Sequence, residues 1–198
     1  MRNFLEPVAL TGDHASLVPL ALEHGPALAE ASADGDLSEL WYTDVPAPEA
    51  MDANIRKRLA RQDAGEMLPF TVLDERAVPV GMTTFTNIER DVPRVEIGYT
   101  WYARRVQRTA VNSQCKLLML THAFEALDCI AVEFRTSTFN RSSRRAIERI
   151  GAKLDGILRS HRRHKNGILR DTCVYSITAP EWPGVKVQLQ SMLARSIA

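Results

Sequence analysis

The sequence predicts an α+β protein built around a mixed sheet, and two observations support that prediction. Between Pro48 and Gln62 the apolar residues show the spacing of an amphipathic helix, whereas from Pro69 the hydrophobic period falls to two, as in strands. Further along the chain, helical and extended segments alternate. The resulting order is helices, a three-strand meander, helix, strand, helix, hairpin and helix, which is typical of an α+β chain with a mixed sheet.

The N-terminal third should contain one short strand and then helices. Pro19 breaks the extended segment, and Pro46 and Pro48 confine the residues before them to extended geometry. Pro48 also suits the first turn of the helix that follows it. The expected elements are an extended segment at 15–20, helical segments at 23–32 and 37–41, a loop at 44–49 and a helix from 48 to 62.

Three strands are expected next, at 70–73, 78–85 and 95–101, with a hairpin turn between the first two. In the third strand, apolar and aromatic residues alternate with Glu96, Gly98 and Thr100. We therefore expect one strongly apolar face and an opposite face that carries a carboxylate beside a residue with no side chain. The residues expected on the apolar face are Val95, Ile97, Tyr99 and Trp101.

The second half begins with a polar, basic connector at 103–109. The helix after it, at 112–127, is apolar on most faces and should be buried, with Asn112 or Ser113 capping its first turn. Gly151 is placed to end a later helix, and the Asn-Gly pair after Lys165 predicts a type I′ hairpin turn. The remaining elements are a strand at 131–138, a helix at 140–150, strands at 153–163 and 169–177, and a helix from about 180.

Length and composition indicate one soluble domain spanning residues 1–198, because the chain has no internal repeat and no low-complexity linker. A net charge of +1 gives no global argument for a nucleic-acid partner. We see no signal peptide and no membrane segment. The three cysteines, Cys115, Cys129 and Cys173, have no metal or redox spacing and are expected to be reduced, mostly buried thiols of a cytoplasmic protein.

The unit from Glu96 to the end of the buried helix could bind an anion. A helix start directly after a strand exposes unpaired N–H groups and the positive end of the helix dipole. Arg104, Arg105 and Arg108 add positive charge, and Thr109 and Ala110 are small enough to let a phosphate approach the backbone. Taken alone, this pattern also fits a helix that binds nothing.

Several segments together resemble the Gcn5-related (GNAT) acetyltransferases. Gln107-Arg-Thr-Ala-Val-Asn112 is similar to the Gln/Arg-x-x-Gly-x-Gly/Ala signature of that family. Asn140-x-x-Ser143, leading to Ala146-Ile-Glu-Arg-Ile-Gly151-Ala, resembles its Asn-x-x-Ser…Glu-Lys-Leu-Gly-Phe helix. The likeness runs in the family's order over roughly residues 10–177. It is closest to the branch that includes the ribosomal-protein N-terminal alanine and serine acetyltransferases.

The resemblance implies a GNAT fold: a mixed, mostly antiparallel sheet of six to seven strands, splayed between its two central strands and flanked by helices. It implies acetyl-CoA as the acyl donor and no metal. The loop and helix start would hold the CoA pyrophosphate, and the splay would admit the pantetheine arm. The implied CoA-binding residues are Trp101, Tyr102, Gln107, Arg108, Thr109, Ala110, Val111, Asn112, Asn140 and Ser143.

Two positions depart from the signature. Ala110 stands where the family usually has glycine, and Asn112 occupies the last small position. The methyl group of Ala110 would shift the phosphate loop or oppose a positive φ there. This departure concerns the affinity for CoA more than the fold.

Acyl transfer from a thioester to an amine requires a base, a polarised carbonyl and a stabilised thiolate. Glu96 is the candidate base, directly or through water; the alternative is an exposed carboxylate paired with Arg94 or Arg135. The resemblance places backbone N–H groups near Trp101 and Tyr102 at the thioester carbonyl. Ser143 could donate to the sulfur or bond back to its own helix. Asn140 could bond the pantetheine amides, cap its helix, or do both.

The resulting hypothesis is direct transfer of acetyl to a primary amine, either a protein N-terminus or a small amine or amino-acid derivative, by an enzyme that is a homo-oligomer, most simply a dimer. The alternative is a non-catalytic acyl-CoA-binding regulatory module on the same fold. The basic run at 159–165 could bind RNA, but it lacks interleaved aromatics and should be a solvated strand face. His161 and His164 lack a third metal ligand. The resemblance places Trp41 and Tyr42 in the region where the family builds its acceptor pocket; the alternative is that they are plain packing residues.

Overall fold

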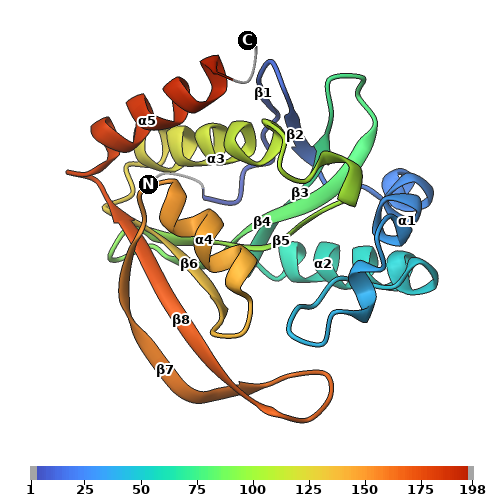
Figure 1. The fold of residues 1–198 in the computed structure, drawn as a ribbon. Helices are drawn as coiled ribbons and strands as arrows, with labels where there is room; N and C mark the ends of the chain where they lie inside the picture. The colour runs from blue at the N-terminus through green and yellow to red at the C-terminus, as the bar shows by residue number, and fades with distance from the viewer. Residues whose placement is uncertain (1–3, 196–198) are drawn as a thin grey trace.

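An eight-stranded sheet forms the centre of the molecule in the computed structural model, which describes residues 4–195 (Figure 1). The strand order is β1-β2-β3-β4-β5-β6-β8-β7, and all neighbouring pairs are antiparallel except the parallel pair β5 and β6. The strands are β1 (Leu10–Thr11), β2 (Ser16–Pro19), β3 (Met67–Leu73), β4 (Pro79–Glu89), β5 (Arg94–Tyr102), β6 (Ala131–Ser137), β7 (Lys153–Arg163) and β8 (Leu169–Thr178). The predicted α+β class is confirmed. The sheet exceeds the expected six or seven strands because the two-residue β1 pairs with β2.

Five α-helices flank the sheet within the described residues. They are α1 (Gly25–Ala33), α2 (Met51–Asp63), α3 (Val111–Thr121), α4 (Arg141–Arg149) and α5 (Trp182–Ala194), and α3 continues into a π-helical turn at His122–Ala126. The helix expected at 37–41 is only a 3-10 turn, Leu37–Glu39, because Asp36 before it is left-handed with φ 52° and Leu40 after it is extended. None of the helices in the described part of the chain is long and apolar enough to cross a membrane.

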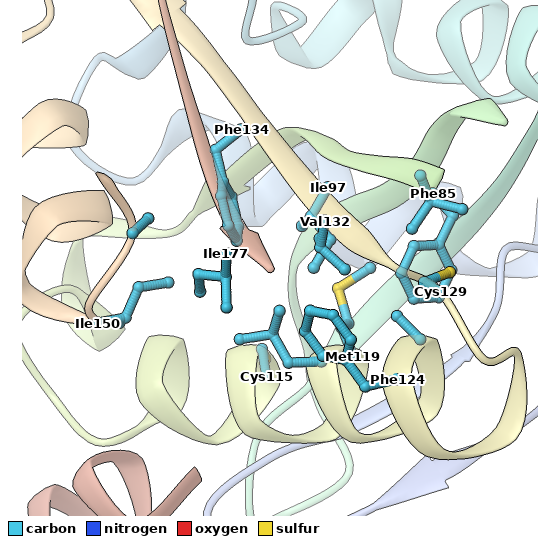
Figure 2. Packing of buried hydrophobic residues seen from close by; sticks show 14 of the residues in the cluster. Phe85, Ile97, Cys115, Met119, Phe124, Cys129, Val132, Phe134, Ile150 and Ile177 are labelled. Atoms are coloured by element: carbon cyan, nitrogen blue, oxygen red, sulfur yellow. The ribbon is translucent and has the colours of Figure 1, made fainter. Parts of the chain in front are cut away.

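One face of the sheet is covered by α3, α4 and α5 and is called the α3 face here. Figure 2 shows Cys115 and Met119 of α3 packed beneath Ile97 of β5, Val132 of β6 and Ile177 of β8. All three cysteines are buried, as predicted, and two of them, Cys115 and Cys173, are fully buried. This large cluster anchors α3 against the two central strands.

The opposite face is covered by α1 and α2 and is called the α2 face. A second buried cluster lies here, and its sheet residues are Met82 of β4 and Trp101 of β5. Arg58 of α2 is also buried and donates a hydrogen bond to Thr84 Oγ1 of β4 at 3.1 Å. The two faces are therefore packed by different helices on either side of β5.

A β-bulge in β5 reverses the expected alternation of its side chains. Met82 pairs with Trp101 but Thr84 pairs with Gly98, so β5 holds one extra residue between them. Tyr99 lies at this point with φ 51° and is 38% exposed. Ile97 consequently packs on the α3 face and Trp101 on the α2 face. The prediction of one apolar face through Tyr99 and Trp101 is wrong, because hydrophobic alternation alone does not reveal an inserted residue.

The turns of the β3–β4 and β7–β8 hairpins share one geometry. At Asp74 and Ala77, and again at His164 and Gly167, the fourth residue donates its N–H to the first and has positive φ, 59° at Ala77 and 82° at Gly167. In the second turn Asn166 does not have positive φ. The type I′ prediction is therefore wrong: the turn has only one left-handed residue, and Asn166 Oδ1 accepts the N–H of Ile168 at 3.1 Å.

Candidate functional site

The two parallel central strands diverge, and this opens a wedge in the sheet. β5 and β6 pair only from Arg94 with Ala131 to Glu96 with Glu133. Beyond these residues β5 continues to Tyr102 and β6 to Ser137 without pairing to each other. The splay predicted between the central strands is confirmed.

The loop before α3 ends at the broad side of this wedge. Thr109 Oγ1 donates to the carbonyl of Val106 at 2.7 Å and accepts the N–H of Val111 at 3.3 Å. The helix begins at Val111 and its N-cap residue is Ala110, so the prediction that Asn112 or Ser113 caps it is wrong. Since an α-helix leaves its first N–H groups without internal partners, the first-turn N–H groups after that of Val111, which Thr109 accepts, are available to an anion.

Ala110 fits this loop without strain. Its φ of −65° and ψ of −20° are right-handed helical values, which any L-residue adopts. The expected conflict between the Ala110 methyl group and a positive φ therefore does not arise. The left-handed position of the loop is Arg108, with φ 62°.

A depression at this helix start collects three guanidinium groups. Arg108 comes from the loop, Arg149 from the end of α4 and Arg195 from the residue after α5. Thr109, Ala110, Ser113 and Met192 complete its lining. Positive side chains together with a helix dipole suit a polyphosphate. Arg149 and Arg195 were missed from sequence because each lies on an ordinary-looking helix end, far along the chain from the loop.

Two other signature residues have mainly structural contacts. Gln107 donates from Nε2 to the carbonyl oxygen of Tyr102 at 2.9 Å and so ties the end of β5 to the loop. Val111 is buried in the core of the α3 face. Asn112 is half-buried in the first turn. Of the predicted signature residues, Arg108, Thr109 and Ala110 line the depression, whereas Gln107 and Val111 support its shape.

Glu96 is buried at the narrow end of the wedge, on the α2 face. It is 8% exposed, accepts a hydrogen bond from Asn87 Nδ2 at 2.5 Å, and lies 3.6 Å from Arg135 Nε. Burial raises the pKa of this carboxyl, against the opposing effects of Arg135 and Asn87. The expected pairing with Arg135 is present, but the carboxylate is not exposed; Arg94 bonds Glu133 instead.

Gly98 gives the Glu96 side chain its room, as predicted. A Cβ atom at Gly98 would lie 2.8 Å from Glu96 Oε1. The carboxylate therefore folds over the glycine toward the unpaired part of the wedge.

Trp101 and Tyr102 follow the bulge. The indole of Trp101 is buried on the α2 face, and its Nε1 has no hydrogen-bond partner among the described residues. Tyr102 lies on the other face against Cys115, and burial raises the pKa of its hydroxyl. The two side chains thus fix the end of β5 from both faces.

Asn140 and Ser143 lie at the start of α4. Asn140 Oδ1 accepts the N–H of Ser143 at 3.0 Å, so the cap interpretation of Asn140 is confirmed. Ser143 is half-buried in the first turn. Both residues lie a few positions after Ser137, where β6 ends on the open side of the wedge.

Three aromatic rings lie together near the end of β6. Trp41 lies 5.1 Å from Phe139 and 5.0 Å from His164 between ring centroids, joining the N-terminal loop, the β6–α4 connection and the β7–β8 hairpin. His164 is buried, and its Nε2 lies 3.3 Å from Ser137 Oγ. The prediction of a solvated face at 159–165 holds for the exposed residues of β7 but is wrong for His164.

Two arginines face each other across the same hairpin. Arg162 and Arg170 are register partners in β7 and β8. Within residues 4–195, neither has a carboxylate within 4.0 Å. Burial lowers the pKa of Arg170, against the opposing charges of Asp44 and Glu96, and Arg162 lowers that of Glu96 after the stronger effects of burial and Arg135. The pair therefore adds positive charge near Glu96.

No group of three or more histidine, cysteine or acidic side chains in the described ranges could hold a metal ion.

Comparison with known sequences places these features in a family. Residues 15–153 match the model of the "Acetyltransferase (GNAT) domain". A curated relative, "Putative ribosomal N-acetyltransferase YdaF" of Bacillus subtilis (strain 168), is 31% identical over 106 residues, which cover 54% of this chain and 57% of that protein. The matched region thus spans little more than half the length of this relative.

Solved structures match along almost the whole chain. The crystal structure of a "putative acetyltransferase" from T. thermophilus has a TM-score of 0.83 and 34% identity, and the match covers 98% of this chain and 100% of that one. Mycobacterium smegmatis RimJ, solved in complex with CoA-disulfide, has the same fold with a TM-score of 0.81 and 20% identity, covering 97% of both chains. With a family model that matches well over half of its residues, the chain belongs to the GNAT acetyltransferase family.

Proposed function

We propose that the chain is an acetyl-CoA-dependent N-acetyltransferase that transfers acetyl directly to a primary amine. One observation carries the proposal: a wedge between β5 and β6 connects the arginine-lined start of α3 with Glu96, which faces the opposite side of the sheet. A donor with a polyphosphate at one end and a thioester at the other fits this path.

In this proposal the CoA pyrophosphate binds the first turn of α3, which includes Asn112. Arg108, Thr109 and Ala110 lie around it, and Arg149 and Arg195 are further cations. The pantetheine arm passes between the diverging strands, with Asn140 bonding its amides. Backbone N–H groups near Trp101 and Tyr102, just after the bulge, polarise the thioester carbonyl. Ser143 donates a hydrogen bond near the sulfur.

Glu96 is proposed to remove the proton from the acceptor amine, directly or through water. Its pKa is raised by burial, which makes it a stronger base than an ordinary carboxylate. A protein α-amine has a pKa of about 7.7–8.0, whereas that of a lysine is about 10.4. The proton is therefore removed more easily from an α-amine, and we propose an N-terminal or amino-acid α-amine as the acceptor.

The pair Arg162 and Arg170 further restricts the class of acceptors that the site would prefer. Like charges directly opposite each other on neighbouring strands are destabilising unless an anion lies between them. Because Arg162 and Arg170 act on the same region as Glu96, an acceptor with its amine at Glu96 would place a nearby carboxylate at these arginines. We propose that acceptors with an acidic residue beside the α-amine are preferred.

The test combines CoA binding, measured by calorimetry, with thiol release from acetyl-CoA. Peptides with Ser or Ala first and Asp, Gln or Lys second serve as acceptors, and a peptide with a blocked N-terminus is the control. The proposal predicts turnover on the free α-amines, with roughly five- to tenfold higher kcat/KM for Asp than for Gln, as expected for one charge-assisted contact. In Arg162→Gln and Arg170→Gln this preference should fall while turnover of the Gln peptide persists.

Tight CoA binding with no turnover on any amine would favour the alternative, a non-catalytic acyl-CoA-binding module. Strong RNA binding that weakens steeply with salt would favour a role for the exposed arginines of β7 instead. CoA binding, turnover and RNA binding can all be measured on the same purified protein.

We further propose that the enzyme is cytoplasmic and forms a homo-oligomer. The three cysteines are buried and have no metal or redox spacing, which supports a reducing compartment. The exposed apolar residues of the edge strand β7, Leu154, Ile157 and Leu158, support contact with a second copy. Sedimentation of the purified protein measures the oligomeric state directly.

A further inference from the structure

A lysine is buried beneath the wedge, and the roles proposed above do not use it. Lys116 of α3 is 6% exposed. Its Nζ lies 3.4 Å from Thr100 Oγ1 of β5 and 5.7 Å from the centroid of the Phe134 ring of β6. Thr100 and Phe134 both lie beyond the last paired residues of their strands, Glu96 and Glu133. The amine is therefore placed between the two diverging strands.

The surroundings of Lys116 do not neutralise its charge. In the described part of the chain it has no carboxylate within 4.0 Å. The titratable group that acts on it is Cys115 on its own helix, which in turn interacts with Tyr102 of β5. Burial raises the pKa of both groups, so both remain neutral. Burial lowers the pKa of Lys116 to about 8. An apolar side chain would pack here at lower free energy.

Lys116 and Glu96 approach the wedge from opposite faces of the sheet. Lys116 comes from α3, which covers the α3 face, and the bulge turns Thr100 toward it. Glu96 alternates with Val95 and Ile97, which pack on the α3 face, so its carboxylate is on the α2 face. An acyl group in the wedge would thus have a base on one side and an ammonium group on the other.

We propose that the Lys116 ammonium group hydrogen-bonds the thioester sulfur of acetyl-CoA and protonates the thiolate that leaves. This inference rests on the proposed acetyltransferase function, because the thioester must lie in the wedge. Acceptor and base occupy the Glu96 side, and the leaving group departs toward α3. A buried ammonium group without a counter-ion interacts most strongly with the anion formed there.

The proton balance closes. Glu96 takes one proton from the acceptor ammonium and releases it to solvent before the next turnover, and the free amine attacks the carbonyl carbon. The new C–N bond forms, the C–S bond breaks with its electron pair on sulfur, and the amide nitrogen loses its surplus proton to solvent. Lys116 gives a proton to sulfur and regains one from water before the next turnover. Its pKa of about 8 is close to that of a thiol, about 8.5, so this transfer is nearly balanced. Ser143 can hydrogen-bond the sulfur but is a far weaker acid.

The deciding experiment titrates the thiol of bound CoA and does not depend on an acceptor. The full chain is saturated with CoA, and the ultraviolet absorbance of the thiolate is followed against pH in wild type, Lys116→Met and Lys116→Gln. Lys57→Met, on the exposed face of α2, is the matched control. A neighbouring ammonium group should lower the thiol pKa by about one unit or more, and both Lys116 variants should lose this shift while Lys57→Met keeps it.

A thiol pKa that is equal in wild type and both Lys116 variants would overturn the role of Lys116 and leave the acetyltransferase proposal intact. Failure of the wild type to bind CoA would overturn the acetyltransferase proposal itself. In steady-state assays, Lys116→Met should lower kcat by about 10²-fold or more with a KM for acetyl-CoA within about threefold. A higher KM for acetyl-CoA with an unchanged kcat would also overturn the proposal.

Discussion

Replacing Lys116 with methionine should make the protein more stable at neutral pH. It should also remove the gain in stability that the wild type obtains from Lys116 as the pH becomes alkaline. Burial lowers the pKa of this lysine from 10.5 to about 8. Each pKa unit corresponds to about 1.4 kcal/mol, so the charged lysine destabilises the folded state by about 3 kcal/mol below pH 8. Methionine has a similar volume, is apolar, and leaves the contacts with the Phe134 ring largely in place.

The sign of the pH dependence follows from proton binding. Between about pH 8 and pH 10.5 the unfolded chain holds a proton on Lys116 that the folded chain has lost, so raising the pH stabilises the wild type across this window. The Met variant lacks this contribution. The difference in free energy of unfolding between variant and wild type should therefore shrink by about 3 kcal/mol from pH 7.5 to pH 10.5.

Urea unfolding at several pH values measures this difference. Cys115 and Tyr102 do not interfere, because burial raises their pKa values and both variants contain them. Lys57→Met, at an exposed site, should give a curve parallel to that of the wild type. A constant difference between Lys116→Met and wild type over this window would refute the assignment of Lys116 as a buried, unpaired cation.

Three further predictions concern the proposed reaction. Glu96→Gln should lower kcat by about 10²-fold and remove the acidic limb of the pH–rate profile, which in the wild type should lie above the usual carboxyl range because the Glu96 pKa is raised; an unchanged rate would remove Glu96 from the mechanism. Ala110→Gly should change the CoA dissociation constant by less than about twofold, because Ala110 is already right-handed; a large loss would show that the loop is misplaced. Arg149→Gln should weaken CoA several-fold at low salt and less at high salt, as calorimetry at two ionic strengths would show.

Much of the fold could be predicted from the sequence because hydrophobic period and punctuation residues are local signals. The order of strands and helices, the turn at Asp74 and the helix-ending Gly151, which has φ 96°, were all predictable in this way. The bulge in β5 was not, because its sequence continues to alternate regularly through Trp101. One inserted residue sends Trp101 to the other face, and only the pairing with β4 reveals it.

The candidate site could be predicted only in part. The signature loop and Glu96 are close in sequence and belong to one strand–loop–helix unit, so their association was predictable. Arg149 and Arg195 reach the depression at the start of α3 from distant segments, and their positions depend on tertiary packing. The same is true of the contact between the rings of Trp41 and His164. The burial of Lys116 could not be predicted from the sequence for another reason. A lysine in an apolar helix is normally assigned to solvent, and its burial follows only from the position of α3 beneath the wedge.

In the proposed complex CoA passes between β5 and β6, with its pyrophosphate at the start of α3. A crystal structure of the chain with bound CoA would show this path. We expect phosphate oxygens about 3 Å from N–H groups in the first turn of α3 and near the Arg108 and Arg149 guanidinium groups, with the thiol between Thr100 and Phe134. Density for CoA elsewhere, or an arm that stays on one face of the sheet, would contradict it.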